Sequence, residues 1–182
     1  MGCWGITALE SDAGLDALDL IRKNLPKDGR MKVKELLKII NEDEWNKPPV
    51  TEAGESHTGV MMLAELMVKF QDGTIQEMEF IPQKPFEKIV SFTADYASVV
   101  WMKSYLFDTL EQAKANAENG IQWNGWFQEE DWSAWQIHMK NLVERLSDIL
   151  QQNIPEMELI QHAENKMTEQ QELMEEGFKM GF

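Results

Sequence analysis

Cysteine is scarce in this chain: Cys3 is the only one among 182 residues. A disulfide within the chain and a metal site built from several thiolates are therefore excluded. Long apolar runs are also missing, because no stretch of about 18 apolar residues could form a transmembrane helix. No apolar segment typical of a signal peptide follows the start, so we expect a cytoplasmic protein.

Basic residues are few relative to acidic ones. The chain has 17 Lys and Arg against 32 Asp and Glu, which gives a formal net charge of -15 at pH 7. Phosphates of nucleic acids and anionic membrane surfaces would be repelled by such a protein. We therefore expect neither nucleic acid nor membrane as a partner, and a basic protein if the partner is a macromolecule.

Motifs for catalysis and metal binding are lacking as well. The sequence has no G-x-S-x-G nucleophile elbow, no glycine-rich phosphate loop and no H-E-x-x-H pair. None of its histidines (His57, His138 and His162) follows a glutamate at the three-residue spacing of ferritin-like metal bundles. We expect no metal and no cofactor. His138 lies beside the apolar stripe of its expected helix, at its border.

What the chain does have is apolar spacing of three and four residues, which predicts helices. Hydrophobic residues make up 43% of the sequence, enough for one core. We expect an all-α bundle of five to six helices with at most a minor β element, forming a single domain over residues 1–154. The expected helices are 11–25, capped by Ser11; 33–40; 57–70; one capped by Thr93 that ends at Asn119-Gly120; and about 129–152.

Three segments are less regular. Asp72-Gly73 fits either the end of a helix or a turn between two strands, and the apolar spacing favours the helix. A short strand is possible from Ile89 to Phe92, and Trp45 is expected to return to the core. From Pro155 we expect a peripheral helical tail, residues 155–182, whose apolar stripe fades after Ile160.

The first residues read M-G-C-W-G-I-T-A-L-E-S-D-A-G-L-D. They resemble the opening of an uncharacterised bacterial family, a domain of unknown function that begins M-G-x-W-G and enters a helix through a D-x-A-x-D-like turn. The resemblance implies a relative and no particular activity, because no activity is assigned to that family. The matching residues are Met1, Gly2, Trp4, Gly5, Asp12, Ala13 and Asp16.

Tryptophans carry the first candidate site. A disordered terminus rarely contains a large apolar ring, so we expect Trp4 to be buried against the helical bundle. Trp123 and Trp126 flank Asn124-Gly125 in an expected loop, whereas Trp132 and Trp135 fall on an apolar stripe and belong to the core. The two loop rings either cap the bundle, with Trp4 beside them, or form a surface that binds a protein or a sugar.

Carboxylates near the chain start form the second candidate site. Asp12 and Asp16 are four residues apart on one helix face, so they could hold a divalent cation or act as an acid–base pair with His57. The simpler interpretation is that they complement the helix dipole and face the solvent.

These observations favour a non-enzymatic interaction domain, in one version an inhibitor or immunity-type protein that masks a basic partner. Two alternatives remain open. One is a small metal-dependent or hydrolytic enzyme that uses the carboxylates of the first helix, and the other is a carbohydrate or small-ligand binder that uses the loop tryptophans.

Overall fold

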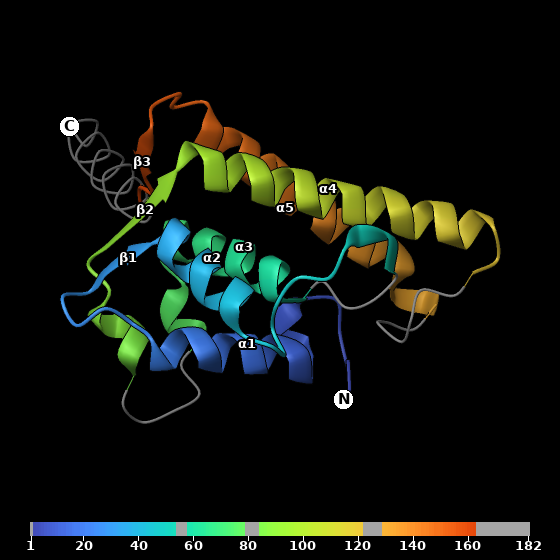
Figure 1. Ribbon diagram of the computed structural model, residues 1–182, viewed down its shortest axis with the longest axis horizontal. Coiled ribbons are helices and arrows are strands. Elements are labelled where there is room, and N and C mark those ends of the chain that lie inside the picture. Colours follow the sequence, from blue (N-terminus) through green and yellow to red (C-terminus); the bar gives the residue numbers. More distant parts are fainter. Residues whose placement is uncertain (1, 54–57, 79–83, 122–128, 163–182) are drawn as a thin grey trace, which may run out of the picture.

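The computed structural model describes residues 2–53, 58–78, 84–121 and 129–162 (Figure 1). Within these ranges, five α-helices and one small three-stranded sheet form the fold. The expectation of a mainly α-helical protein with a minor β element is confirmed. None of the helices in the described ranges has the length and apolar character needed to cross a membrane.

The two N-terminal helices follow the predicted apolar stripes. Helix α1 spans Asp12–Lys23, and its predicted N-cap is confirmed because the Ser11 hydroxyl accepts the backbone N–H of Gly14 at 3.0 Å. Helix α2 spans Val33–Glu42 and buries one face. The predicted helix at 33–40 is confirmed, and its buried residues are Val33, Leu36, Leu37 and Ile40.

Helix α3, Thr58–Gln71, is the central helix of the core. Apolar residues are buried all around it, which is typical of a helix enclosed by other elements. It contacts α1, α2, α4 and α5. The backbone N–H of Thr74 bonds to the carbonyl of Lys69 at 2.8 Å, so Asp72-Gly73 closes this helix and does not join two strands. The helical interpretation of this segment is confirmed.

Helices α4, Tyr96–Glu118, and α5, Trp132–Leu150, are the longest elements of the fold. They lie along one another over one side of the remaining helices, and α5 runs back toward the end at which α4 begins (Figure 1). Trp135 is buried as predicted, and Trp132 is partly buried against the core. The other buried residues of α5 continue the apolar stripe of Trp135 at steps of three and four: Met139, Leu142, Leu146 and Ile149.

The sheet lies at the end of the molecule where α4 begins (Figure 1). Strand β2, Ser91–Asp95, is its centre; β1, Arg30–Lys32, pairs with it in parallel and β3, Glu156–Glu158, pairs antiparallel. The expected helix from Pro155 is therefore wrong at residues 156–158, and residues 163–182 of the expected tail lie outside the described residues. Backbone pairing to β2 overrides the local helical preference.

The start of α4 also differs from the prediction. Thr93 lies within β2 and does not cap the helix. The N-cap is Asp95, whose carboxylate accepts the backbone N–H of Ser98 at 3.0 Å. Short 3-10 helices connect the main elements: η1 Ala8–Glu10, η2 Thr51–Ala53, η3 Ile75–Met78, η4 Pro85–Lys88 and η5 Glu129–Asp131.

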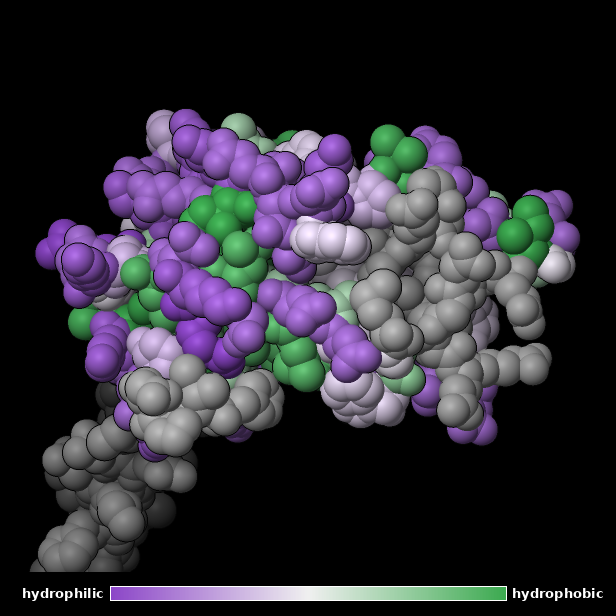
Figure 2. Space-filling model, turned by 60° about the horizontal axis from the view of Figure 1, so that its bottom comes forward, coloured by the Kyte–Doolittle hydropathy of each residue, from purple (hydrophilic) through white to green (hydrophobic). Residues whose placement is uncertain are grey.

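Trp45 does not return to the core, because the residue is 91% exposed. The backbone after α2 turns outward there, since the carboxylate of Asp43 accepts the N–H groups of Trp45 and Asn46 at 3.0 and 2.9 Å. The expected burial of this ring is therefore wrong. Figure 2 shows one face of the molecule, where hydrophilic side chains predominate and hydrophobic ones reach the surface in smaller areas between them.

Helix α1 and the 3-10 helix η1 approach one another very closely at Gly14. A Cβ atom added to Gly14 would lie 1.7 Å from the carbonyl oxygen of Ala8. Only glycine, which has no side chain, allows this approach, so the position of η1 against α1 depends on glycine at residue 14.

We predict that Gly14→Ala destabilises the protein by about 1–3 kcal/mol, because the added methyl forces η1 away from α1. Urea denaturation followed by far-UV circular dichroism measures the effect. Gly2→Ala is the matched control, because its added Cβ would meet its nearest atom at an ordinary 3.7 Å. Equal stability of the two variants would contradict the close contact.

Candidate functional site

Several residues of the predicted sites lie outside the described residues. These are Trp123 and Trp126, the loop pair, and His57, the proposed partner of the two aspartates. Binding of a carbohydrate or small ligand by the loop tryptophans therefore stays a prediction.

Trp4 is described, and its expected burial is wrong: the residue is 58% exposed. Its backbone is nevertheless held in place, since the N–H of Trp4 bonds to the carbonyl of Glu10 at 2.9 Å and Cys3 forms an isolated β-bridge with Ser11. Neighbouring side chains of an extended segment point to opposite sides. Cys3 packs against the core, so the ring of Trp4 faces outward.

Both aspartates of the second site lie on the exposed surface of α1. Asp12 is exposed, and its carboxylate accepts the backbone N–H of Gly2 at 2.7 Å, which ties the chain start to α1. Asp16 is exposed as well. Within the described part of the chain, no group of three or more His, Cys, Asp or Glu residues could hold a metal ion.

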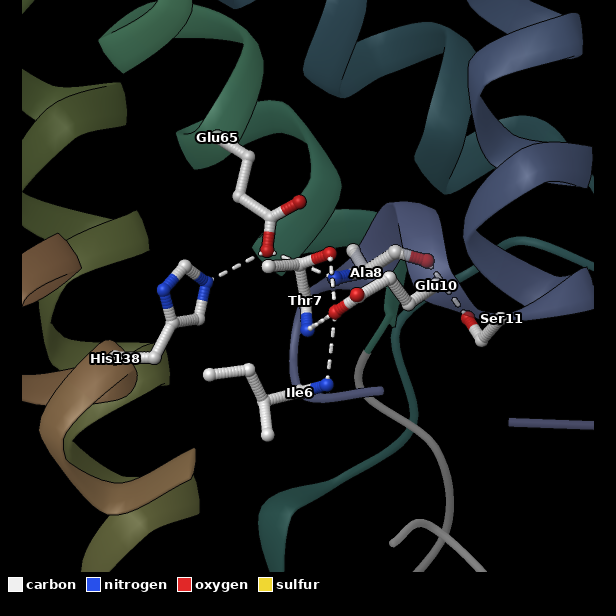
Figure 3. Close-up of polar contacts among 7 residues, drawn as sticks. All are labelled: Ile6, Thr7, Ala8, Glu10, Ser11, Glu65 and His138. Atoms are coloured by element: carbon white, nitrogen blue, oxygen red, sulfur yellow. Dashed lines mark hydrogen bonds and ion pairs between the residues drawn. The ribbon is translucent and has the colours of Figure 1, made fainter. Parts of the chain in front are cut away.

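A different carboxylate, that of Glu65, occupies the interior of the fold. Glu65 lies in the apolar central helix α3 and is only 5% exposed. Its Oε1 accepts the backbone N–H of Ala8 in η1 at 2.8 Å and lies 2.8 Å from Nε2 of His138 in α5 (Figure 3). One carboxylate thereby joins three elements that are far apart in the sequence.

The contact between Oε1 of Glu65 and Nε2 of His138 lies within hydrogen-bond distance. The second oxygen of Glu65, Oε2, is buried and has no hydrogen-bond partner among the described residues. A buried, incompletely satisfied carboxylate is uncommon and costs free energy.

Glu10 turns back onto the chain that precedes it. Its Oε2 accepts the backbone N–H groups of Ile6 and Thr7 at 2.9 and 3.0 Å and the Thr7 hydroxyl at 3.1 Å (Figure 3). These hydrogen bonds, that from the Thr7 N–H above all, hold the pKa of Glu10 below its ordinary value of 4.5. Glu10 is therefore ionised at neutral pH and stabilises the turn before η1.

A cavity of about 420 Å³ opens beside these residues, between η1, α3 and α5. Its walls combine apolar side chains with ionisable ones. The described residues that line it are Thr7, Leu9, Glu10, Glu65, Val68, Lys69, Asp72, Thr74, Glu77, His138 and Leu142.

Negative charge exceeds positive charge in the described lining. Lys69 pairs with Glu77 at 3.1 Å, and Arg145 pairs with Asp72 at 2.7 Å. No Lys or Arg of the described residues forms an ion pair with Glu10 or Glu65. Among the described residues, the contacts of these two carboxylates are therefore with His138 and with N–H and hydroxyl groups.

Sequence reasoning missed Glu65 as a site residue and placed His138 only at the border of a helix stripe. The available signal was a glutamate within the apolar run V-M-M-L-A-E-L-M-V, because a charged residue in a buried helix needs a partner. The identity of that partner, 73 residues away, has no local signature.

Comparisons with protein-family models, with curated proteins and with solved structures give no match to this chain.

We predict that Glu65→Ala destabilises the protein by about 2–4 kcal/mol, because it leaves the N–H groups of Ala8 and His138 without an acceptor. Glu65→Gln is the matched variant; its amide oxygen can still accept, so we expect a smaller loss. Urea denaturation measures both effects.

A double-mutant cycle separates the Glu65–His138 pair from the rest of the network. Combining Glu65→Ala with His138→Ala should reveal a coupling of about 0.5–3 kcal/mol. Strictly additive losses would show that the two side chains do not interact.

The pH dependence of stability tests Glu10. Because its folded pKa is lowered, its stabilising contribution is fully present above pH 4.5 and is lost as the pH falls through the folded value. We predict that Glu10→Gln is less stable than the wild type at pH 6 and that this difference shrinks toward pH 3. Thermal unfolding at a series of pH values measures it, and a difference independent of pH would contradict the prediction.

Proposed function

We propose that this protein is a non-enzymatic interaction domain that binds a basic partner protein through the face that holds the cavity. The proposal rests on one observation: Glu10 and Glu65 line the cavity without a Lys or Arg partner among the described residues. A cationic group from another molecule would supply the missing positive charge.

The overall charge supports a basic partner. With a formal net charge of -15, the chain attracts positively charged proteins over long distances and repels acidic ones. Such attraction accelerates encounter and weakens as salt increases. The single cysteine fits a cytoplasmic location for this function, because the chain has no internal disulfide to maintain.

The exposed ring of Trp4 also supports protein binding. The residue is 58% exposed, and its backbone N–H bonds to the carbonyl of Glu10, a residue of the cavity lining. Tryptophan is among the residues that most often dominate the binding energy of protein interfaces.

Affinity capture from a native lysate of the source organism, with partners identified by mass spectrometry, tests the proposal. We predict that a basic protein is retained at low salt and released as the salt concentration rises. Trp4→Ala should weaken retention by about 2 kcal/mol of binding free energy, as loss of a central tryptophan does at other interfaces.

Two matched controls locate the binding face. Trp45→Ala removes a still more exposed tryptophan ring, 91% against 58%, from the segment after α2, and should leave retention unchanged. Glu77→Gln neutralises a cavity residue and should weaken retention of the partner. Glu35→Gln makes the same change on α2 and should leave retention unchanged; it is a matched control because the side chains of Glu77 and Glu35 are 61% and 63% exposed.

Retention that does not change with salt concentration, or that falls equally in test and control variants, would overturn the proposal.

A further inference from the structure

We infer that the cavity between η1, α3 and α5 binds the guanidinium group of an arginine side chain. The inference rests on the proposed function and names the group that the basic partner inserts. It combines two features of the described lining: carboxylates, one of them buried, and apolar walls.

The buried carboxylate supplies the attraction. Glu65 is 5% exposed, so water screens its charge poorly, and an ionised Glu65 attracts a cation in the adjoining cavity more strongly than a surface carboxylate would. Its Oε2 has no hydrogen-bond partner among the described residues, so one buried oxygen of this carboxyl group is left unsatisfied. Glu10 adds a second carboxylate without a Lys or Arg partner in that part of the chain.

The donor set of arginine matches the carboxylates of this lining. A guanidinium group has five N–H donors and no acceptor, so it is complementary to the carboxylates of Glu10 and Glu65. The ring of His138 lines the same cavity, so its resonances report on a group that binds there.

The apolar walls favour arginine over lysine. Leu9, Val68 and Leu142 lie among the lining residues. A guanidinium is planar and weakly hydrated, so it loses less on entering a partly apolar cavity than the compact, strongly hydrated ammonium of lysine. A volume of about 420 Å³ is ample for one arginine side chain.

The experiment uses the full chain and three small probes: N-acetyl-arginine amide, N-acetyl-citrulline amide and N-acetyl-lysine amide. Citrulline has nearly the shape of arginine without its charge. Binding is followed by NMR through the Cε1–H resonance of His138, assigned with the variant H138Q. We expect arginine to bind at least about tenfold more tightly than citrulline and several-fold more tightly than lysine.

Charge variants then locate the binding. Glu65→Gln removes the buried charge and keeps an acceptor, so the affinity for the arginine probe should fall by about tenfold or more. Lys69→Gln removes the cation of the lining and should raise the affinity about two- to fivefold. Glu35→Gln, on α2, makes the same charge change as Glu65→Gln away from the cavity and should have no effect beyond long-range screening.

The outcomes are distinguishable. Equal binding of arginine and citrulline, or shifts that leave His138 unaffected, would overturn the inference. If Glu65→Gln fails to fold by circular dichroism, an unchanged affinity in Lys69→Gln would overturn it instead. Absence of probe binding together with salt-dependent capture of a basic protein would refute the guanidinium site and leave the proposed function standing.

Discussion

The carboxylate of Glu65 makes polar contacts with two other elements that share its hydrophobic core. It lies in the most enclosed helix, α3, and binds the N–H of Ala8 on one side and the imidazole of His138 on the other. A charge placed there without partners would cost several kcal/mol, so the 3-10 helix η1 and helix α5 must both be present. The cavity exists where these three elements meet.

The contacts of residues 6–14 place the backbone N–H of Ala8 where it can bond to Glu65. Glu10 binds the N–H groups of Ile6 and Thr7, Ser11 caps α1, and Gly14 lets η1 approach that helix to contact distance. These contacts bring the N–H of Ala8 to Glu65 and leave the ring of Trp4 outside. The opening residues are thus part of the fold and at the same time form the border of the cavity.

Acidic residues outnumber basic ones around the cavity, which favours a positively charged ligand. Lys69 and Arg145 neutralise Glu77 and Asp72, but the charges nearest the interior, those of Glu10 and Glu65, stay uncompensated by any described Lys or Arg. In a protein of net charge -15, this local excess adds to a general attraction for cations. This excess of carboxylates at the cavity is what the proposed binding of a basic protein depends on.

The amino-acid sequence by itself determined the helices, because apolar residues three and four positions apart specify a buried face locally: Leu36 and Ile40 in α2 and Met139 and Leu146 in α5 lie where this spacing places them. It predicted nothing useful for the cavity, since the Glu65–His138 contact spans 73 residues. Only the tertiary structure decided that residues 156–158 form a strand, that Trp4 and Trp45 face outward, and which groups meet Glu65. Strand pairing and the partners of a buried charge depend on segments distant in the chain, and local periodicity carries no information about them.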